Sequence, residues 1–206
     1  MRSAVNAEGG SGECEVAVRI PGWALNEAVP GGLYRFLDKN EEKPGLRVNG
    51  KTVKIDPAAG YARVRRAWKL NDVLELKLPM PVRRVVAAAL IAADSGMAAL
   101  QRGPLVYCAE VVDNGGGVLE TVLPDYVKLQ AAFRPDLLNG VEAVQGLARR
   151  KVKTPEGKAE WQSVEFLAVP YYAWANRAAG EMTVWFPRTE AAVKPRQGRG
   201  KVDPVL

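Results

Sequence analysis

The chain has 206 residues, of which 48% are hydrophobic, and a formal net charge of +6, so it can bury a core in one large or two small domains. It has no histidine and two cysteines, which excludes Ser-His-Asp, Cys-His and HExxH chemistry and leaves too few ligands for a closed zinc site. No apolar run approaches the length that spans a bilayer, so we expect a soluble globular protein without a membrane partner.

The two ends of the chain differ in composition from the rest. Residues 1–14 are rich in Gly, Ser and Glu, and we expect a flexible leader. It lacks the apolar stretch of a secretory signal, so the chain, if complete, is expected in the cytoplasm. Residues 189–206 contain Pro, Gly and basic residues without hydrophobic periodicity, which predicts a mobile basic tail. The other basic residues are spread along presumed strands, which does not indicate nucleic-acid binding.

The first half of the chain alternates apolar and polar residues, which is typical of half-buried strands. The predicted strands cover residues 15–20, 60–68 and 73–78. Asn49-Gly50 lies between two further alternating runs and predicts a tight β-hairpin, because both residues tolerate positive φ. Residues 15–92 are therefore expected to form a first antiparallel β-sandwich.

The segment 85–93 is the ambiguous part of this pattern. Its alanines favour a helix intrinsically. The preceding Pro81 and the Asp94-Ser95-Gly96 turn signal fit a connection between two domains equally well. We leave both alternatives open and place the domain boundary here.

Residues 93–188 are expected to form a second antiparallel β-sandwich. Gly103-Pro104 interrupts two apolar runs and predicts a bulge or an edge-strand kink, because proline donates no ladder hydrogen bond. Further strands are predicted over residues 141–148, 164–169 and 182–186, with a polar loop over residues 151–158. The predicted fold class is thus all-β, with two consecutive antiparallel β-sandwich domains.

One aromatic segment, residues 170–177, stands between two predicted strands. It contains Tyr171, Tyr172 and Trp174, followed by Asn176 and Arg177. The first interpretation is a packed corner, because large aromatic side chains supply much buried area. The second is a sugar platform, because flat aromatic faces stack on the apolar faces of sugar rings.

Charged side chains offer few catalytic candidates. Arg102 beside Gly-Pro, and Arg177 beside Asn, are candidate contacts, although such arginines commonly bind backbone carbonyls at a corner. Glycoside hydrolysis needs two carboxyl groups across a cleft. Four acids are candidates for such a pair, namely Glu110, Asp113, Glu165 and Glu181. None lies in a motif that would raise its pKa, so no catalytic residue is assigned. Cys14 and Cys108 are expected to be small thiols in or near a core.

Several short motifs, in their order and spacing, resemble the C-terminal part of glycoside hydrolase family 127, the β-L-arabinofuranosidase family. The motifs are VRIPGWA at residues 18–24, VNG at 48–50, GY at 60–61, RAW at 66–68 with Asp72, LPMPVR at 78–83, ALQRGPLVY at 99–107 with Glu110, PYYAWANR at 170–177 and MTVW at 182–185. They cover roughly residues 15–187.

The resemblance implies a parent enzyme with an N-terminal (α/α)6 barrel followed by two β-sandwich domains. In the family the barrel carries the catalytic machinery, a zinc-bound cysteine nucleophile with further cysteines and a glutamate. Cys108 lies in a sandwich motif and not in that cluster, so no catalytic, cofactor-binding or metal-binding role is carried over to this chain. Zinc is expected only in the absent barrel.

Two hypotheses follow from the residues and the resemblance together. In the first, the chain is the non-catalytic β-sandwich portion of a family 127 enzyme. Its partners would be the barrel and, at a subunit interface, a second copy in a homodimer. In the second, the chain is an autonomous carbohydrate-binding module that uses Tyr171, Tyr172 and Trp174. The remaining hypothesis is that the chain is a complete hydrolase that uses carboxylates alone.

Overall fold

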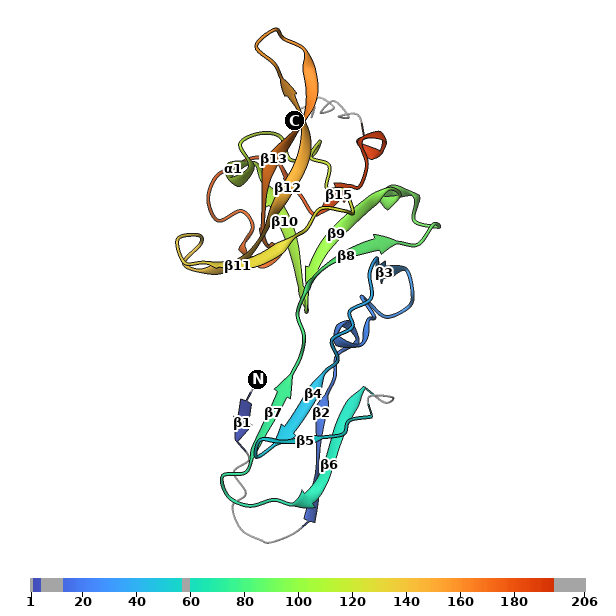
Figure 1. Cartoon of the computed structure of the whole chain (residues 1–206), viewed down its shortest axis with the longest axis vertical. Coiled ribbons are helices and arrows are strands. Elements are labelled where there is room, and N and C mark those ends of the chain that lie inside the picture. Colours follow the sequence, from blue (N-terminus) through green and yellow to red (C-terminus); the bar gives the residue numbers. More distant parts are fainter. Residues whose placement is uncertain (1, 5–12, 57–59, 195–206) are drawn as a thin grey trace, which may run out of the picture. The chain divides into compact units, whose positions relative to one another are not determined.

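The structure is a computed structural model that describes residues 2–4, 13–56 and 60–194 (Figure 1). Its strands pair in antiparallel fashion, which confirms the predicted all-β class. The packing of the sheets as sandwiches stays a prediction. Among the described residues, no helix is both long enough and apolar enough to cross a membrane.

The chain folds as two compact units. The first contains Met1–Leu90 and Gln101–Leu105, and the second contains Ile91–Leu100 and Val106–Leu206. The sequence placed the boundary between residues 92 and 93, whereas the structure changes unit after Leu90 and returns five residues, Gln101–Leu105, to the first unit.

The first unit contains three groups of paired strands. A four-stranded sheet has the order β1-β7-β4-β5, β2 pairs with β6, and β3 pairs with β8. The strands are β1 (Arg2–Ala4), β2 (Glu13–Arg19), β3 (Tyr34–Phe36), β4 (Gly45–Val48), β5 (Lys51–Val53), β6 (Tyr61–Ala67), β7 (Val73–Lys77) and β8 (Val82–Ala87), and one 3-10 helix, η1 (Gly22–Leu25), follows β2.

The predicted Asn-Gly hairpin is confirmed. β4 and β5 pair on either side of Asn49 and Gly50, whose φ angles of 49° and 77° are both positive. Asparagine and glycine adopt this region at little cost, which is why the turn forms here.

Two predictions for this unit are corrected. The leader was expected to be flexible throughout, yet β1 pairs with β7; three residues are too few to show an alternation in the sequence. Residues 5–12 of the leader lie outside the described residues. The segment 85–93 begins as strand, because β8 continues to Ala87, and then ends in the short 3-10 helix η3 (Ala92–Asp94). Intrinsic alanine propensity was overridden by strand pairing.

The core of the first unit is apolar and built from the apolar face of the predicted alternation. Trp68 is 4% exposed, and its Nε1–H donates to the Cys14 carbonyl at 3.2 Å. The buried cluster consists of Ile20, Ala24, Leu46, Val48, Ala62, Val64, Trp68, Leu74 and Leu76, with Trp23 packed against it.

The second unit is organised around one sheet with the order β11-β12-β13-β10-β9, to which β14 adds on β10 and β15 on β9. The strands are β9 (Met97–Arg102), β10 (Leu105–Glu110), β11 (Gln130–Arg134), β12 (Val141–Lys153), β13 (Ala159–Pro170), β14 (Met182–Thr183) and β15 (Trp185–Pro187), with helices α1 (Val111–Asn114), η4 (Tyr171–Ala173) and η5 (Glu190–Ala192).

The β12–β13 hairpin is longer than expected. Residues 151–158 were predicted to be a loop, but pairing continues to Lys153 and Ala159, so only residues 154–158 form the turn. The end of the hairpin extends past the neighbouring strands (Figure 1). Charged residues within an exposed two-stranded ribbon lack the apolar alternation that identifies a strand, which explains the error.

Two further positions differ from the prediction. Gly103-Pro104 is a tight turn between β9 and β10, with Gly103 at φ 58°, and not a bulge within one strand. The mobile tail was predicted from residue 189 onward, but residues 190–192 form η5 and Glu190 pairs with Arg149 at 2.8 Å. Residues 195–206 lie outside the described residues.

The core of the second unit centres on the aromatic pair Phe166 and Phe186. Their rings meet edge to face, with centroids 5.2 Å apart, and both side chains are at most 2% exposed. Such pairs add to the stabilisation that comes from burial alone. Tyr107, Cys108, Leu123, Val144 and Val169 are buried as well.

Candidate functional site

The aromatic segment forms one short turn at the end of β13. Tyr171–Ala173 is the 3-10 helix η4, and only Ala173 of its residues is buried. The Tyr171 and Trp174 rings stack on each other, with centroids 5.7 Å apart and an interplanar angle of 18°. Tyr172 is 68% exposed. The three aromatic side chains therefore do not form one continuous flat platform.

Arg177 binds two carboxylates that come from a different part of the second unit. Its Nη2 donates to Glu110 Oε2 at 2.5 Å and to Asp113 Oδ2 at 2.6 Å, and its Nη1 donates to Asp113 Oδ1. Glu110 is the last residue of β10 and Asp113 lies in α1. We call Arg177, Glu110 and Asp113 the arginine clamp.

The arginine clamp also fixes the backbone of the aromatic segment. Ala175 has a φ of 63°, a left-handed conformation that is costly for a residue with a Cβ. Its N–H donates to Glu110 Oε1 at 3.4 Å. Contacts on both sides of Ala175 therefore hold a turn that this residue does not prefer by itself.

Hydrogen bonding in the clamp raises the pKa of Arg177, chiefly through Asp113 and then through Glu110. The arginine is therefore always charged and bound to both acids. Two carboxylates that share one cation cannot face each other across a substrate, as the acid pair of a glycosidase must. The absence of a catalytic role for Glu110 and Asp113 stays a prediction.

Cys108 lies on β10 beside the clamp and is fully buried. Burial, and secondarily the negative charge of Glu110, raise the pKa of its thiol to about 11. Because the thiolate is the nucleophilic form, this thiol is unreactive at neutral pH.

Asn114 fixes α1 to the sheet. Its Nδ2 donates to the carbonyls of Glu110 at 2.8 Å and Leu167 at 2.9 Å, and its Oδ1 accepts from the Leu167 N–H at 3.0 Å. The amide side chain thereby bonds to the backbone of β13 as a neighbouring strand would. Nothing in the sequence around Asn114 indicates this role, because its partner is 53 residues away.

A hollow of about 640 Å³ lies between the aromatic segment and the turn that precedes β12. Its polar lining includes Asp136, Asn139, Asn176 and Arg177, and its aromatic lining is Tyr172. Asn176 Nδ2 donates to the carbonyls of Ala173 at 3.0 Å and Trp174 at 3.2 Å. We call this site the Tyr172 hollow. Asp136 and Asn139 were missed in the sequence, which marks them only as turn residues.

The remaining predicted residues are dispersed. Arg102 belongs to the first unit, apart from the aromatic segment in the second. Glu165 is exposed on β13 and lines a separate hollow that also includes Asp113. Glu181 contributes its backbone carbonyl to the Val111 N–H at 3.0 Å. The structure thus brings together Tyr172, Asn176 and Arg177 of the predicted contacts.

A zinc ion requires a set of Cys, His or acidic side chains that lie close together. Among the described residues, no three His, Cys, Asp or Glu side chains gather as a metal site would require. Cys14 is exposed in the first unit, and Cys108 is buried in the second. A closed zinc site takes four Cys or His ligands, and the chain has two cysteines, which lie in different units, and no histidine.

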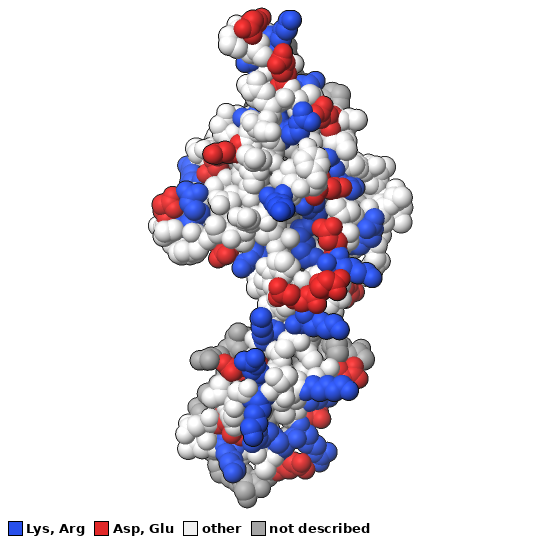
Figure 2. Space-filling model, in the orientation of Figure 1, with Lys and Arg blue, Asp and Glu red and all other residues white. Residues whose placement is uncertain are grey.

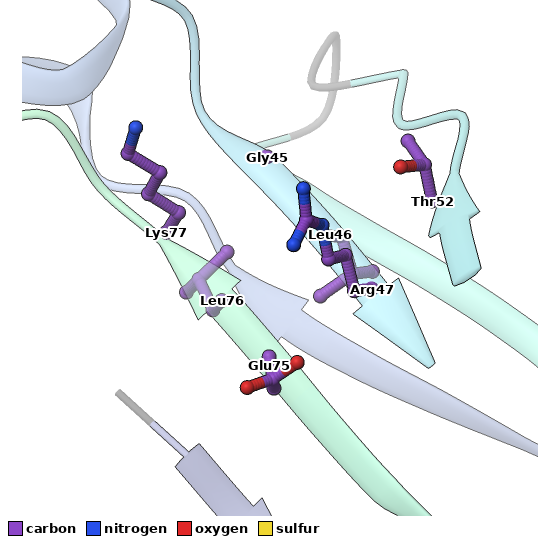
Figure 3. Close-up of a pocket in the computed structure, with 7 residues that line it drawn as sticks. All are labelled: Gly45, Leu46, Arg47, Thr52, Glu75, Leu76 and Lys77. Carbon is purple, nitrogen blue, oxygen red and sulfur yellow. The ribbon is translucent and has the colours of Figure 1, made fainter. Parts of the chain in front are cut away.

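Another hollow, in the first unit, has a lining of different chemistry. It is lined by Gly45, Leu46, Arg47, Thr52, Glu75, Leu76 and Lys77 (Figure 3). Its one carboxylate, Glu75, lies opposite Arg47 in the β4–β7 pairing. A single acid among two cations lacks the pair that glycoside hydrolysis uses. Figure 2 shows Lys and Arg side chains over the visible face of this unit.

The fold and the sites define an all-β, two-unit protein whose acids near the candidate site are bound by an arginine. The comparison with known families then identifies the family to which it belongs. Residues 2–80 match the beta-L-arabinofuranosidase GH127 middle domain, and residues 82–187 match the glycoside hydrolase family 127 C-terminal domain. The chain belongs to glycoside hydrolase family 127.

Relatives of known sequence and structure agree. The chain is 37% identical over 189 residues to a non-reducing end beta-L-arabinofuranosidase of Bifidobacterium longum subsp. longum, covering 84% of this chain and 28% of that protein. A solved GH127 beta-arabinofuranosidase has a TM-score of 0.86 at 35% identity, over 94% of this chain and 30% of its own. The GH127 beta-L-arabinofuranosidase of Geobacillus stearothermophilus has a TM-score of 0.76 at 38% identity, over 90% and 28%.

The chain therefore spans less than a third of the length of these relatives. What it shares with them is the middle and C-terminal domains.

Proposed function

We propose that the chain is the non-catalytic β portion of a family 127 glycoside hydrolase and supports a catalytic barrel. The observation that carries the proposal is the match to the middle and C-terminal domains over nearly the whole chain, at 28% to 30% of the relatives' length. The substrate proposed for the assembled enzyme is a β-L-arabinofuranoside, the one in the relatives' names.

Features of the described residues favour a non-catalytic role. The acids near the candidate site are bound by Arg177, and the buried thiol of Cys108 is protonated. Large apolar side chains are exposed in both units, among them Leu70 at 64% and Leu90 at 76% in the first. The proposal predicts that the barrel, or a second copy in a homodimer, covers some of these side chains.

A domain exchange tests the proposal. The matching region of the Bifidobacterium longum relative is replaced by this chain, and release of arabinose from a β-L-arabinofuranoside is compared with that of the intact relative and of a relative without the region. We expect activity in the exchange protein and loss of activity or of soluble expression without the region. The purified chain alone, with and without zinc, should release no arabinose.

Two results would contradict this role. One is turnover by the chain alone at a rate comparable to that of the intact relative. The other is full activity of the relative after the region is deleted. The mass of the purified chain in solution, measured by light scattering, tests the homodimer separately.

A second candidate function is carbohydrate binding by the chain itself. One observation favours it: Tyr172 is 68% exposed and lines a hollow with polar side chains. The test is titration of the chain with arabinose oligosaccharides while tryptophan fluorescence is followed, because Trp174 lies two residues from Tyr172. An unchanged signal at millimolar sugar would dismiss this function.

A further inference from the structure

We propose that the Tyr172 hollow is a binding site for one neutral sugar unit, formed by Tyr172, Asn139 and Asn176. The proposal rests on the second candidate function, carbohydrate binding, and assigns it to a different set of residues. Tyr171 and Trp174 are stacked on each other, so they serve the shape of the turn. A volume of about 640 Å³ lies in the range of ligand sites.

The aromatic part of the site is the exposed ring of Tyr172. An open aromatic face binds the C–H groups on one face of a sugar ring and excludes water from them, while the hydroxyls at the ring edge stay free for hydrogen bonds. Tyr172 combines this exposure, 68%, with a position in the lining of the hollow.

The polar part supplies both donors and acceptors. Asn139 makes no hydrogen bond to the described part of the chain, so its amide offers two donors and an acceptor. Asn176 uses Nδ2 to bind the Ala173 and Trp174 carbonyls, which orients its Oδ1 as an acceptor. Hydroxyl groups both donate and accept, so they match such a mixed lining.

The charge around the hollow favours a neutral ligand over an ion. Asp136 is neutralised by Arg134 through two hydrogen bonds of 3.0 and 2.7 Å. Arg177 is bound by two carboxylates, so the clamp carries one net negative charge. An anion such as phosphate meets no available cation here, and the acids are already bound.

The site is also preorganised. The arginine clamp holds Ala175 in a left-handed conformation between Tyr172 and Arg177, so the backbone of this turn is held in place before a ligand arrives. A site that is ordered beforehand loses less conformational entropy on binding.

The experiment is saturation-transfer NMR on the full chain with L-arabinose and, separately, D-glucose as probes at millimolar concentration. We expect transfer to the ring C–H protons of at least one sugar. Tyr172→Ala should weaken binding about tenfold or more, and Tyr172→Phe, which keeps the ring, should stay within about threefold of the original protein. Asn139→Ala should weaken binding by a smaller factor.

The matched control is Tyr126→Ala, because Tyr126 is 77% exposed in the same unit and is not part of the hollow. It should leave binding unchanged. Circular dichroism of every variant confirms that it is folded.

The outcomes separate this site from the broader function. Equal weakening by Tyr126→Ala and Tyr172→Ala, or unchanged binding in Tyr172→Ala, would overturn the site while leaving carbohydrate binding in place. No transfer from either sugar would overturn both. Binding of inorganic phosphate in competition with the sugars would overturn the argument for a neutral ligand.

Discussion

Both units contain a polar network that joins distant turns, but they use different chemistry. In the first unit, Asn49 Nδ2 donates to Asp72 Oδ1 at 2.7 Å and Asn49 Oδ1 accepts from the Val73 N–H at 2.8 Å. In the second unit, Arg177 of the arginine clamp binds two acids through a partly buried guanidinium. An uncharged amide thus links two turns in one unit, and an ion pair fixes the aromatic segment in the other.

The difference has a physical consequence. A neutral amide loses less solvation on burial than a charge does, so removing it costs mainly the hydrogen bonds that it made and the partners that it leaves unpaired. A charge inside a protein loses much more solvation. Removing one partner of an ion pair leaves the other charges unpaired, and this costs more free energy than the pair itself contributed. The second unit should therefore be the more sensitive to loss of its polar network.

The largest effects should come from the two cores. We expect Trp68→Ala in the first unit and Phe166→Ala in the second each to lower the free energy of unfolding of its own unit by about 3–5 kcal/mol. Both side chains are at most 4% exposed. Hydrogen exchange resolved by peptide shows which unit is affected, and an equal effect on both units would show that they unfold together.

The next effect belongs to the clamp. Arg177→Met should destabilise the second unit by about 3 kcal/mol, because it leaves Glu110 and Asp113 without their cation. Urea denaturation measures it. Arg134→Met is the matched control: its pair with Asp136 is exposed, so a loss within about 1 kcal/mol is expected. Similar losses in the two variants would refute the special role of the clamp.

The two amides, of which Asn114 is buried and Asn49 is exposed, should rank below the clamp. Asn114→Ala removes three hydrogen bonds to the backbone and should cost about 2 kcal/mol. Asn49→Ala removes bonds to Asp72 and Val73 and should cost about 1 kcal/mol or more, since it also loses a residue suited to positive φ. Denaturation curves of the two variants compare the units directly, and a larger loss for Asn49→Ala would reverse the ranking.

The smallest effect is a pH dependence in the first unit. The hydrogen bond from Asn49, followed by that from the Lys69 N–H, lowers the pKa of Asp72 below its ordinary value of 3.8. A lowered folded-state pKa contributes stability above the ordinary value, and that contribution is lost as the pH falls through the lower folded value.

We therefore expect the stability of the first unit to fall as the pH is lowered from about 5, above the ordinary value, to about 2, below it. Asp72→Asn should reduce the fall, because it removes the titrating group and keeps the shape of the side chain. Denaturation at the two pH values checks this, and an unchanged slope in the variant would assign the acid sensitivity to other carboxylates.

The sequence by itself determined the all-β class and most of the strands, because alternation and turn residues act over a few positions. The Asn49-Gly50 hairpin is the clearest example, since its φ angles follow from two adjacent residues. The motifs that identified the family are likewise short and keep their order.

Tertiary structure alone decided which polar groups meet. Arg177 finds Asp113 and Glu110 across 64 and 67 residues. Asn139 precedes β12 and Tyr172 follows β13, so both line one hollow at the open end of the β12–β13 hairpin. The pairing of the strands brings these residues close together. Because pairing between distant strands depends on the whole sheet and not on neighbouring residues, no local pattern in the chain could reveal them.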